Sequence, residues 1–235
     1  MIDWGWMADH LDELAFRLVQ HLYLAAIALV VGFMISLGLA IWAVRRRQVY
    51  APITAATGIL YTIPSLALFA ALVPITGLSL ITAEVPLVLY TLLIFVRNIV
   101  AGFDSVPPEV LEAADGMGYR TSQRLRRVEM PLSVPLMIAG LRVASVSTIG
   151  LVTITATIGD RFGGLGFFIL EGWRHYFPTE MLFVAVPSMA LAVTVDLVLV
   201  AVQRRATPWS RPGGPPADAG PLEIPPLPMP GEAGG

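Results

Sequence analysis

Residues 22–44 read LYLAAIALVVGFMISLGLAIWAV and end directly against Arg45, Arg46 and Arg47. These 23 residues carry no charge, and as an α-helix they would be about 34 Å long, which is enough to cross a bilayer. A cleaved signal peptide would place its positive charges before the apolar run, whereas here they follow it and acidic residues precede it. The sequence therefore predicts a transmembrane helix over 22–44.

Four more apolar segments follow. We expect further transmembrane helices over about 53–73, 85–103, 132–158 and 181–203. Arg97 lies in the third span, Arg142 in the fourth and Asp196 in the fifth, and Asp196 is the only acidic residue within any predicted span. The predicted fold is an all-α membrane protein with five transmembrane helices.

The composition agrees with this fold class and excludes several functions. Hydrophobic residues make up 56% of the 235 residues and charged residues only 14%, whereas a soluble domain carries about a quarter charged residues. The net charge of −2 gives no indication of a nucleic-acid partner. The chain has no cysteine, and its three histidines lack the spacing of metal ligands. We therefore predict no metal site, no catalytic residue and no enzymatic activity.

The basic residues, all fifteen of them arginines, predict the orientation in the membrane. With five spans, one side holds ten arginines, in the 45–52 segment, the 104–131 loop and the C-terminal segment. The other side holds Arg17, Arg161 and Arg174. Because cytoplasmic loops carry the excess of positive charge, we expect the N-terminus outside and the C-terminus in the cytoplasm.

Both ends of the chain differ from the spans. Residues 1–21 contain Leu11, Leu14 and Leu18 at helical spacing, with Asp9 placed to cap the helix, so we expect an amphipathic helix on the outer membrane surface. Residues 206–235 contain nine prolines and six glycines. That composition predicts a disordered cytoplasmic tail, and a proline-rich docking ligand is the alternative.

The charges within the spans should have partners, because an arginine or aspartate at the centre of a helix costs about 2.5–3.5 kcal/mol on insertion scales. Arg97, Arg142 and Asp196 lie about 10–16 Å from the cytoplasmic ends of their helices, so they share a depth. We expect a structural ion pair or triad, with a gate as the alternative.

The loop over 104–131 contains the most informative segment, DSVPPEVLEAADGMG at 104–118. Asp104 or Ser105 can cap a short helix, and Gly116 or Gly118 can end it in a left-handed conformation. A second short helix fits 121–128, stopped before Pro131. The loop would be a compact knob of two helices, unless it is a mere connector.

This loop resembles the EAA loop of ABC importer permeases, whose pattern is Glu-Ala-Ala, three residues, Gly, nine residues, Ile, any residue, Leu and Pro. The matching residues are Glu112, Ala113, Ala114, Gly118, Val128, Met130 and Pro131, in which valine replaces isoleucine and methionine replaces leucine. The resemblance covers about residues 20–205, with the permease domain over 22–205, and implies the type I importer permease fold in the inner membrane, with several passes.

In that family the loop docks in a groove of a separate ATPase. The resemblance therefore implies two ATPase subunits that bind ATP and magnesium, a second permease copy or homologue, and an external substrate-binding protein. This chain itself has no Gly-x-x-x-x-Gly-Lys phosphate loop and would need no cofactor.

A narrower resemblance is to osmoprotectant permeases, which import glycine betaine, choline, carnitine or proline. It rests on YTIPSLAL at 61–68, PITG at 74–77, Arg97-Asn98, GGLG at 163–166 and Asp196-Leu197. The substrate would be a small zwitterionic or cationic solute. A permease for another small solute, such as an amino acid, and an ion-coupled secondary carrier are the alternatives; the carrier would need inverted repeats and acidic relays.

We expect the translocation pathway near Pro64, which interrupts the second span and frees a backbone carbonyl. The candidate pathway residues are Tyr61, Thr62, Pro64, Ser65 and Asn98, and a packing kink at Pro64 is the alternative. The GGLG run should be a flexible turn or re-entrant backbone. The ion-pair candidates should not hold a zwitterion tightly, because an importer must release its cargo.

Overall fold

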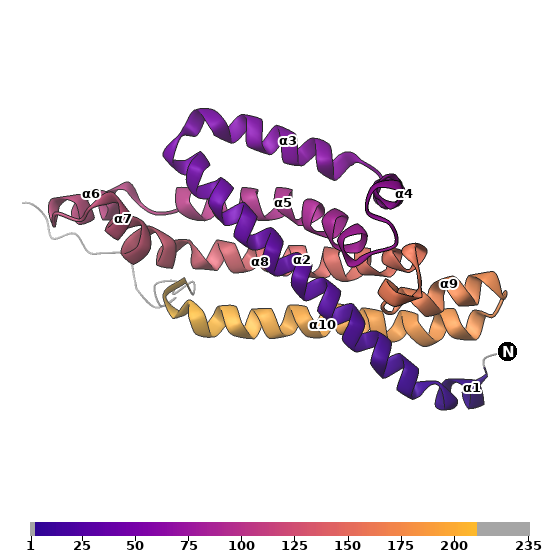
Figure 1. The fold of residues 1–235 in the computed structure, drawn as a ribbon. Coiled ribbons are helices and arrows are strands. Elements are labelled where there is room, and N and C mark those ends of the chain that lie inside the picture. The colour runs from indigo at the N-terminus through magenta and orange to yellow at the C-terminus, as the bar shows by residue number, and fades with distance from the viewer. Residues whose placement is uncertain (1–2, 211–235) are drawn as a thin grey trace, which may run out of the picture.

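In the computed structural model, which describes residues 3–210, helices α5, α8 and α10 run side by side and α2 crosses them obliquely (Figure 1). Their bounds are Leu11–Arg45 for α2, Leu80–Asp104 for α5, Met130–Val152 for α8 and Pro178–Ala206 for α10. Each is long and apolar enough to cross a membrane, α8 as part of a continuous helical segment over Thr121–Ile158. These four helices correspond to the first, third, fourth and fifth predicted spans.

The second predicted span is not one continuous helix. Helix α3 (Tyr50–Thr62) and helix α4 (Ser65–Thr76) are bent by 90° at Ile63 and Pro64, so the expectation of a single helix over 53–73 is wrong. Pro64 has no N–H for the helical ladder, and Ile63 before it takes an extended backbone, as residues before proline prefer. The Tyr90 hydroxyl of α5 donates to the carbonyl of Ile63, which lies at the break between the two helices.

The N-terminal segment also differs from the expectation. A short helix α1 (Trp4–Asp9) precedes α2, which already begins at Leu11, so the leucines at 11, 14 and 18 belong to the first spanning helix and not to a separate surface helix. Asp3 caps α1, because its carboxylate accepts from the Trp6 N–H at 3.0 Å. The N-cap of α2 is His10, which makes no side-chain cap hydrogen bond, so Asp9 does not cap that helix as expected. Of the predicted tail, Ala206 is the last residue of α10 and Pro208–Ser210 form a 3-10 turn. Residues 211–235 lie outside the described residues.

Small residues allow the central helices to approach closely. A Cβ added at Gly32 of α2 would lie 1.9 Å from the Thr91 hydroxyl of α5, and one at Gly140 of α8 would lie 2.6 Å from the Asn98 Cβ of α5. Such contacts are typical of helix pairs in membranes, where packing replaces the hydrophobic driving force. The core therefore lies between α2, α5 and α8, and contains fully buried side chains such as Phe95 and Ile99.

The GGLG segment is a packed turn. After the 3-10 helix η3 (Thr153–Ile158), the Gly164 N–H donates to the Gln20 side chain at 2.9 Å and the Leu165 N–H to His21 Nδ1 at 3.2 Å. His21 Nε2 in turn lies 2.9 Å from the Ile149 carbonyl, so the buried His21 connects α2, α8 and the turn. These contacts hold the turn against α2 and α8.

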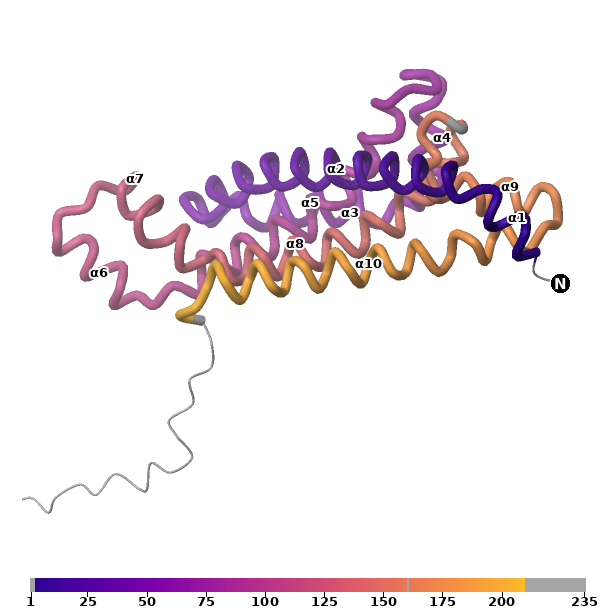
Figure 2. The backbone as a smooth tube through the Cα atoms, turned by 90° about the horizontal axis from the view of Figure 1, so that it is seen from below, coloured from indigo at the N-terminus to yellow at the C-terminus, as the bar shows by residue number. Residues whose placement is uncertain are grey.

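The two ends of the bundle are different. The short helices α6 (Pro108–Gly116) and α7 (Thr121–Arg124) project from one end, and α1 and α9 (Gly166–Arg174) lie at the other (Figure 2). The C-terminal ends of α2 and α10 lie at the same end as α6 and α7. Helices α6 and α7 thus project from the end of the bundle at which the arginines are concentrated.

Candidate functional site

The α6–α7 loop, residues 105–129, is the knob predicted from the sequence. Helix α6 ends in a Schellman motif, in which the Gly118 N–H donates to the Asp115 carbonyl at 2.9 Å and the Tyr119 N–H to the Ala114 carbonyl at 3.1 Å. Gly118 has a φ of +77°, so it, and not Gly116, is the left-handed residue of the turn. The side chain of Asp104 does not cap α6: it forms an ion pair with Arg47 instead.

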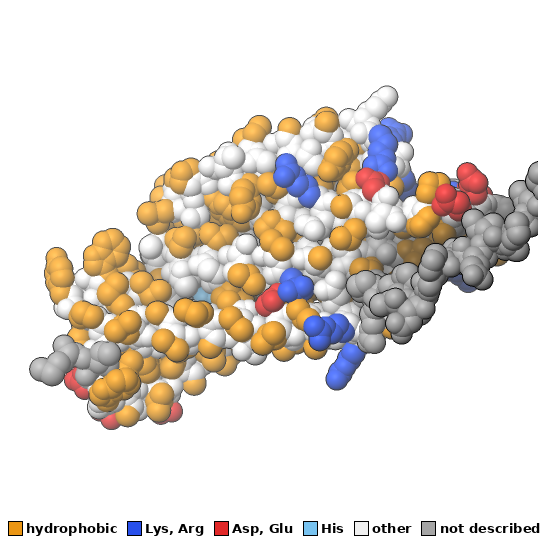
Figure 3. Space-filling view, turned by 180° about the vertical axis from the view of Figure 1, so that it is seen from behind, with side chains coloured by type: hydrophobic (Ala, Val, Ile, Leu, Met, Phe, Trp, Pro, Cys, Tyr) orange, Lys and Arg blue, Asp and Glu red, His pale blue; other side chains and the backbone are white. Residues whose placement is uncertain are grey.

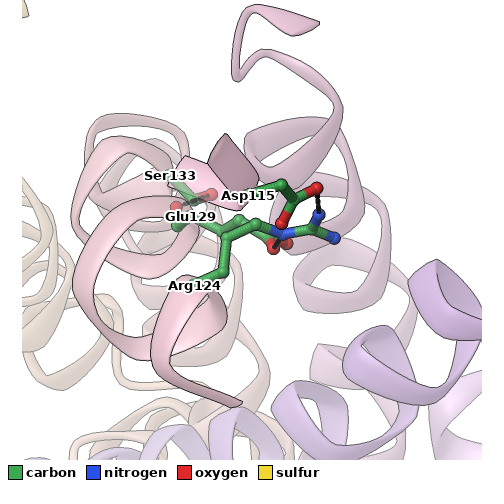
Figure 4. A network of polar contacts seen from close by, with 4 residues as sticks. All are labelled: Asp115, Arg124, Glu129 and Ser133. Atoms are coloured by element: carbon green, nitrogen blue, oxygen red, sulfur yellow. Dashed lines mark hydrogen bonds and ion pairs between the residues drawn. The ribbon is translucent and has the colours of Figure 1, made fainter. Parts of the chain in front are cut away.

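Arg124 holds this loop together (Figure 4). Its Nη1 donates to Asp115 Oδ2 at 2.6 Å and its Nε to Glu129 Oε1 at 2.8 Å. The Ser133 hydroxyl donates to the Glu129 backbone carbonyl at 2.7 Å, which fixes the same turn to α8. One guanidinium thus connects the end of α6 to the start of a spanning helix. Arg124 and Glu129 were not predicted, because residues five apart do not share a face of an α-helix and only the π-helical turn brings them together.

Pro131 does not end the second helix. A π-helical turn over Leu125–Glu129 follows α7 and leads directly into α8, in which Pro131 is the second residue. In this turn the Met130 N–H donates to the carbonyl of Leu125, five residues back. The wider turn accommodates a proline that lacks its own N–H. The expectation of a helix stopped before Pro131 is therefore wrong.

The EAA residues divide into an exposed and a buried set. Glu112 and Ala113 are exposed, whereas Ala114 is 1% exposed and packs inside the loop. Val110, Ala113 and Met117 are spaced at i, i+3 and i+7, are all exposed, and give α6 an apolar outer face. Val128 and Met130 are partly buried, and Pro131 is exposed. The outer face of α6 is thus an exposed apolar surface of the loop that could contact another protein.

Two of the three intramembrane charges form a pair. Arg142 of α8 donates to Asp196 of α10 through Nε at 2.8 Å and Nη2 at 3.0 Å. Arg97 is exposed on α5 and has no hydrogen bond or ion pair with any residue in the described part of the chain. The structure therefore contains an ion pair between Arg142 and Asp196 and not a triad.

The Arg142–Asp196 pair lines a groove between α8 and α10. The ion-pair groove has a volume of about 470 Å³ and is lined by Ala139, Arg142, Val143, Val146, Ser147 and Asp196. About a third of each charged side chain is exposed: 33% for Arg142 and 31% for Asp196. Figure 3 shows positive and negative side chains in the middle of a largely hydrophobic face.

The pathway candidates of the second span gather at the broken helix. The Tyr61 ring packs edge-on against Tyr90 with the ring centroids 5.6 Å apart, and the Thr62 hydroxyl donates to the Ile59 carbonyl of its own helix at 2.7 Å. Pro64 is exposed and Ser65 begins α4. Asn98 is not with them: its amide donates to the Ile94 carbonyl at 2.8 Å, and its Cβ packs against Gly140.

Helix α5 contains a buried carboxylate that the predicted span did not include. Helix α5 begins at Leu80, with Ser79 as its cap, and so includes Glu84, which the predicted third span left out. Glu84 is 8% exposed, and neither of its carboxylate oxygens has a hydrogen-bond partner. Asp196 is therefore not the only acidic residue within a spanning helix.

The described residues offer no other chemical centre. Within residues 3–210, no three histidine, aspartate or glutamate side chains come together in a group that could hold a metal ion.

Comparison with known proteins identifies relatives of the chain. Residues 28–208 match the family described as "Binding-protein-dependent transport system inner membrane component". The chain is 34% identical over 196 residues to the glycine betaine/carnitine/choline transport system permease protein OpuCB of Bacillus subtilis (strain 168), covering 83% of this chain and 89% of that protein. It is 36% identical over 208 residues to the osmoprotectant import permease protein OsmW of Salmonella typhimurium, covering 86% and 96%.

Two solved structures share the fold. The inward-facing MetNI methionine ABC transporter superposes with a TM-score of 0.74 at 23% identity, covering 83% of this chain and 96% of that chain. An amino acid ABC transporter with histidines gives a TM-score of 0.71 at 17% identity, covering 87% and 99%. At these identities the likeness concerns the fold alone.

Proposed function

Because the chain belongs to the family of binding-protein-dependent transport system inner membrane components, we propose that it is the membrane-spanning subunit of an ATP-driven importer of osmoprotectants. The observation that carries this proposal is the α6–α7 loop. Its helices project from one end of the spanning bundle, and Arg124 fixes them to α8. A rigid projection with an apolar outer face is suited to receive force from another subunit and pass it to the spans.

The energy would come from other chains. In the proposed assembly two ATPase subunits bind ATP and magnesium, and the α6–α7 loop of this chain docks in a surface groove of one of them. Closure of the ATPase dimer moves the loop, and the spans then expose the pathway to the other side of the membrane. A second permease copy or homologue completes the pathway, and an external binding protein delivers the solute. The assembly lies in the inner membrane.

The relatives support the substrate class. Their names include glycine betaine, carnitine and choline, and their identities to this chain exceed 30% over more than four fifths of its length. We therefore assign glycine betaine, choline or carnitine as the substrate class, each of which carries a quaternary ammonium group. The methionine and amino acid importers share the fold at lower identity, which supports the architecture and not their solutes.

Uptake in proteoliposomes tests the proposed function. The permease is reconstituted with its ATPase and binding protein, and uptake of radiolabelled glycine betaine is measured with ATP, without ATP, and with an imposed sodium or proton gradient. We expect uptake that requires ATP and does not depend on the sodium or proton gradient. Uptake driven by a gradient in the absence of ATP would favour a secondary carrier.

Crosslinking tests the role of the loop in the same preparation. Met117→Cys, at a position 67% exposed on the outer face of α6, should crosslink to a cysteine in the surface groove of the ATPase. Ala114→Cys is the matched control, because Ala114 is 1% exposed and should not react. The native chain has no cysteine, so every crosslink reports the introduced thiol. Equal yields at the two positions, or none at Met117, would contradict docking through this face.

A further inference from the structure

The ion-pair groove raises a physical problem. Arg142 lies 12 residues after the start of α8, and Asp196 lies 10 residues before the end of α10. At 1.5 Å per residue, these positions are about 18 Å and 15 Å along helices whose hydrophobic surroundings are about 30 Å thick. Both charges thus lie near the middle of the bilayer, yet about a third of each side chain is exposed at the surface of the subunit.

This face cannot be covered by lipid. Hydrocarbon cannot form hydrogen bonds with the sides of the guanidinium and carboxylate groups that point away from the ion pair. Charged side chains in membranes face protein or water for that reason. Arg97 strengthens the argument. It is a third exposed charge, and it lies beside Asn98, which contacts Gly140 two residues before Arg142. Exposed charges within three spanning helices indicate a polar environment outside the subunit.

We propose that the ion-pair groove is a water-filled part of the translocation pathway and a transient site for the solute, in which Asp196 faces the quaternary ammonium group and Arg142 faces a carboxylate. The inference rests on the proposed function. The groove has a volume of about 470 Å³, within the range of small-molecule sites, which is about 300–1,000 Å³. Its rim of Ala139, Val143 and Val146 suits the methyl groups of such a solute.

The arrangement matches the charges of a zwitterion. Arg142 and Asp196 satisfy each other when the groove is empty, so neither charge lacks a partner between transport events. When a zwitterion binds, its ammonium group can take the place of Arg142 beside Asp196, and its carboxylate can take the place of Asp196 beside Arg142. The net charge of the groove does not change. Because the ion pair re-forms as the solute leaves, the site binds weakly and releases its cargo, as transport requires.

The alternative is that the pair is only a structural link between α8 and α10. The two roles differ in how each single variant discriminates between solutes. Arg142→Gln leaves Asp196 alone, which should favour choline, a cation without a carboxylate, over glycine betaine. Asp196→Asn leaves Arg142 alone, which should disfavour choline more than glycine betaine. A structural link predicts that both variants lower the uptake of both solutes in the same proportion.

The experiment measures ATP-dependent uptake of choline and glycine betaine by the reconstituted wild type and both variants. We expect the choline-to-betaine ratio to rise about three- to fivefold in Arg142→Gln and to fall by a similar factor in Asp196→Asn, which is the effect of one partly exposed ion pair. Arg47→Gln is the control, because it removes an exposed ion pair outside the spans and should leave the ratio unchanged. Ratios that stay within twofold of the wild type in both variants would overturn the transient site.

A second measurement does not depend on the charged variants folding. Val143→Cys places a thiol at a groove position that is 55% exposed, and Ala144→Cys places one at the next residue, which is fully buried. A water-soluble methanethiosulfonate reagent should modify Val143→Cys in the assembled transporter and leave Ala144→Cys unmodified. No labelling of Val143→Cys, with or without ATP, would show that the groove is dry and would overturn the inference.

Uptake of neither solute by the wild type would instead refute the proposed function, while the labelling would still report on water in the groove.

Discussion

At the scale of single residues, Glu84 is the least satisfied group in the spanning helices. Its two carboxylate oxygens are buried without partners, and such a group costs about 1–3 kcal/mol. We therefore expect Glu84→Met, which has a similar length and removes the polar atoms, to raise the free energy of unfolding by about that amount. Thermal unfolding of the purified permease in detergent measures the change. Thr82→Val, two residues earlier on α5, is the matched control with the opposite sign, because the Thr82 hydroxyl is fully buried and bonded to Thr76 at 2.7 Å. A less stable Glu84→Met variant would contradict the view that the Glu84 carboxylate destabilises the purified permease.

The charged residues also show what a sequence can predict about a site. Depth along a helix follows from residue counting, so the sequence placed Arg97, Arg142 and Asp196 at one level. Which of them meet depends on which helix faces pack, and this depends on contacts such as Asn98 against Gly140. Arg97 consequently has no described partner, and Arg142 takes Asp196 alone. Glu84 was missed for a simpler reason: α5 begins five residues before the predicted span.

At the scale of secondary structure, the apolar runs predicted the existence of four spanning helices, although α2 begins eleven residues before its predicted span, and proline was a poor guide to the breaks. Pro74, Pro86, Pro135 and Pro187 all lie inside helices that continue through them. Pro64 alone among the prolines of the described spans accompanies a 90° bend, and there Tyr90 supplies the hydrogen bond that the break requires. Whether a proline bends a helix thus depends on a partner from another helix, which the local sequence does not contain.

The α6–α7 loop gives a prediction at the same scale. Arg124→Ala removes both contacts that connect α6 to the π-helical turn and should destabilise the loop locally by about 1–2 kcal/mol. We expect hydrogen exchange over 108–118 to become roughly 5–30 times faster, and solute uptake per ATP hydrolysed to fall. Exchange in α5 and α8 should not change. Arg126→Ala is the matched control, because Arg126 is exposed two residues away. Unchanged exchange in Arg124→Ala would mean that other contacts hold α6 in place.

At the scale of the whole molecule, the unequal ends of the bundle agree with the unequal distribution of arginines. The end that carries α6 and α7 also carries the Arg45–Arg47 cluster at the end of α2 and Arg204 and Arg205 at the end of α10. Arg161 and Arg174 lie in the segments at the other end. Positive residues remain on the cytoplasmic side during insertion, so the α6–α7 loop should face the cytoplasm, which is the only compartment that contains ATP for a partner ATPase.

Labelling from the two sides of the membrane tests this orientation in a chain without native cysteine. Leu78→Cys lies in the connection between α4 and α5 and is 66% exposed, whereas Met117→Cys lies on α6 and is 67% exposed, so the two positions are equally accessible and differ only in the end of the bundle. In intact cells a membrane-impermeant maleimide should modify Leu78→Cys and not Met117→Cys. In inside-out vesicles the pattern should reverse, and the unmodified wild type should remain unlabelled in both. If Met117→Cys reacted in intact cells, the α6–α7 loop would lie outside the cell, where no ATPase could dock, and the proposed coupling would fail together with the orientation.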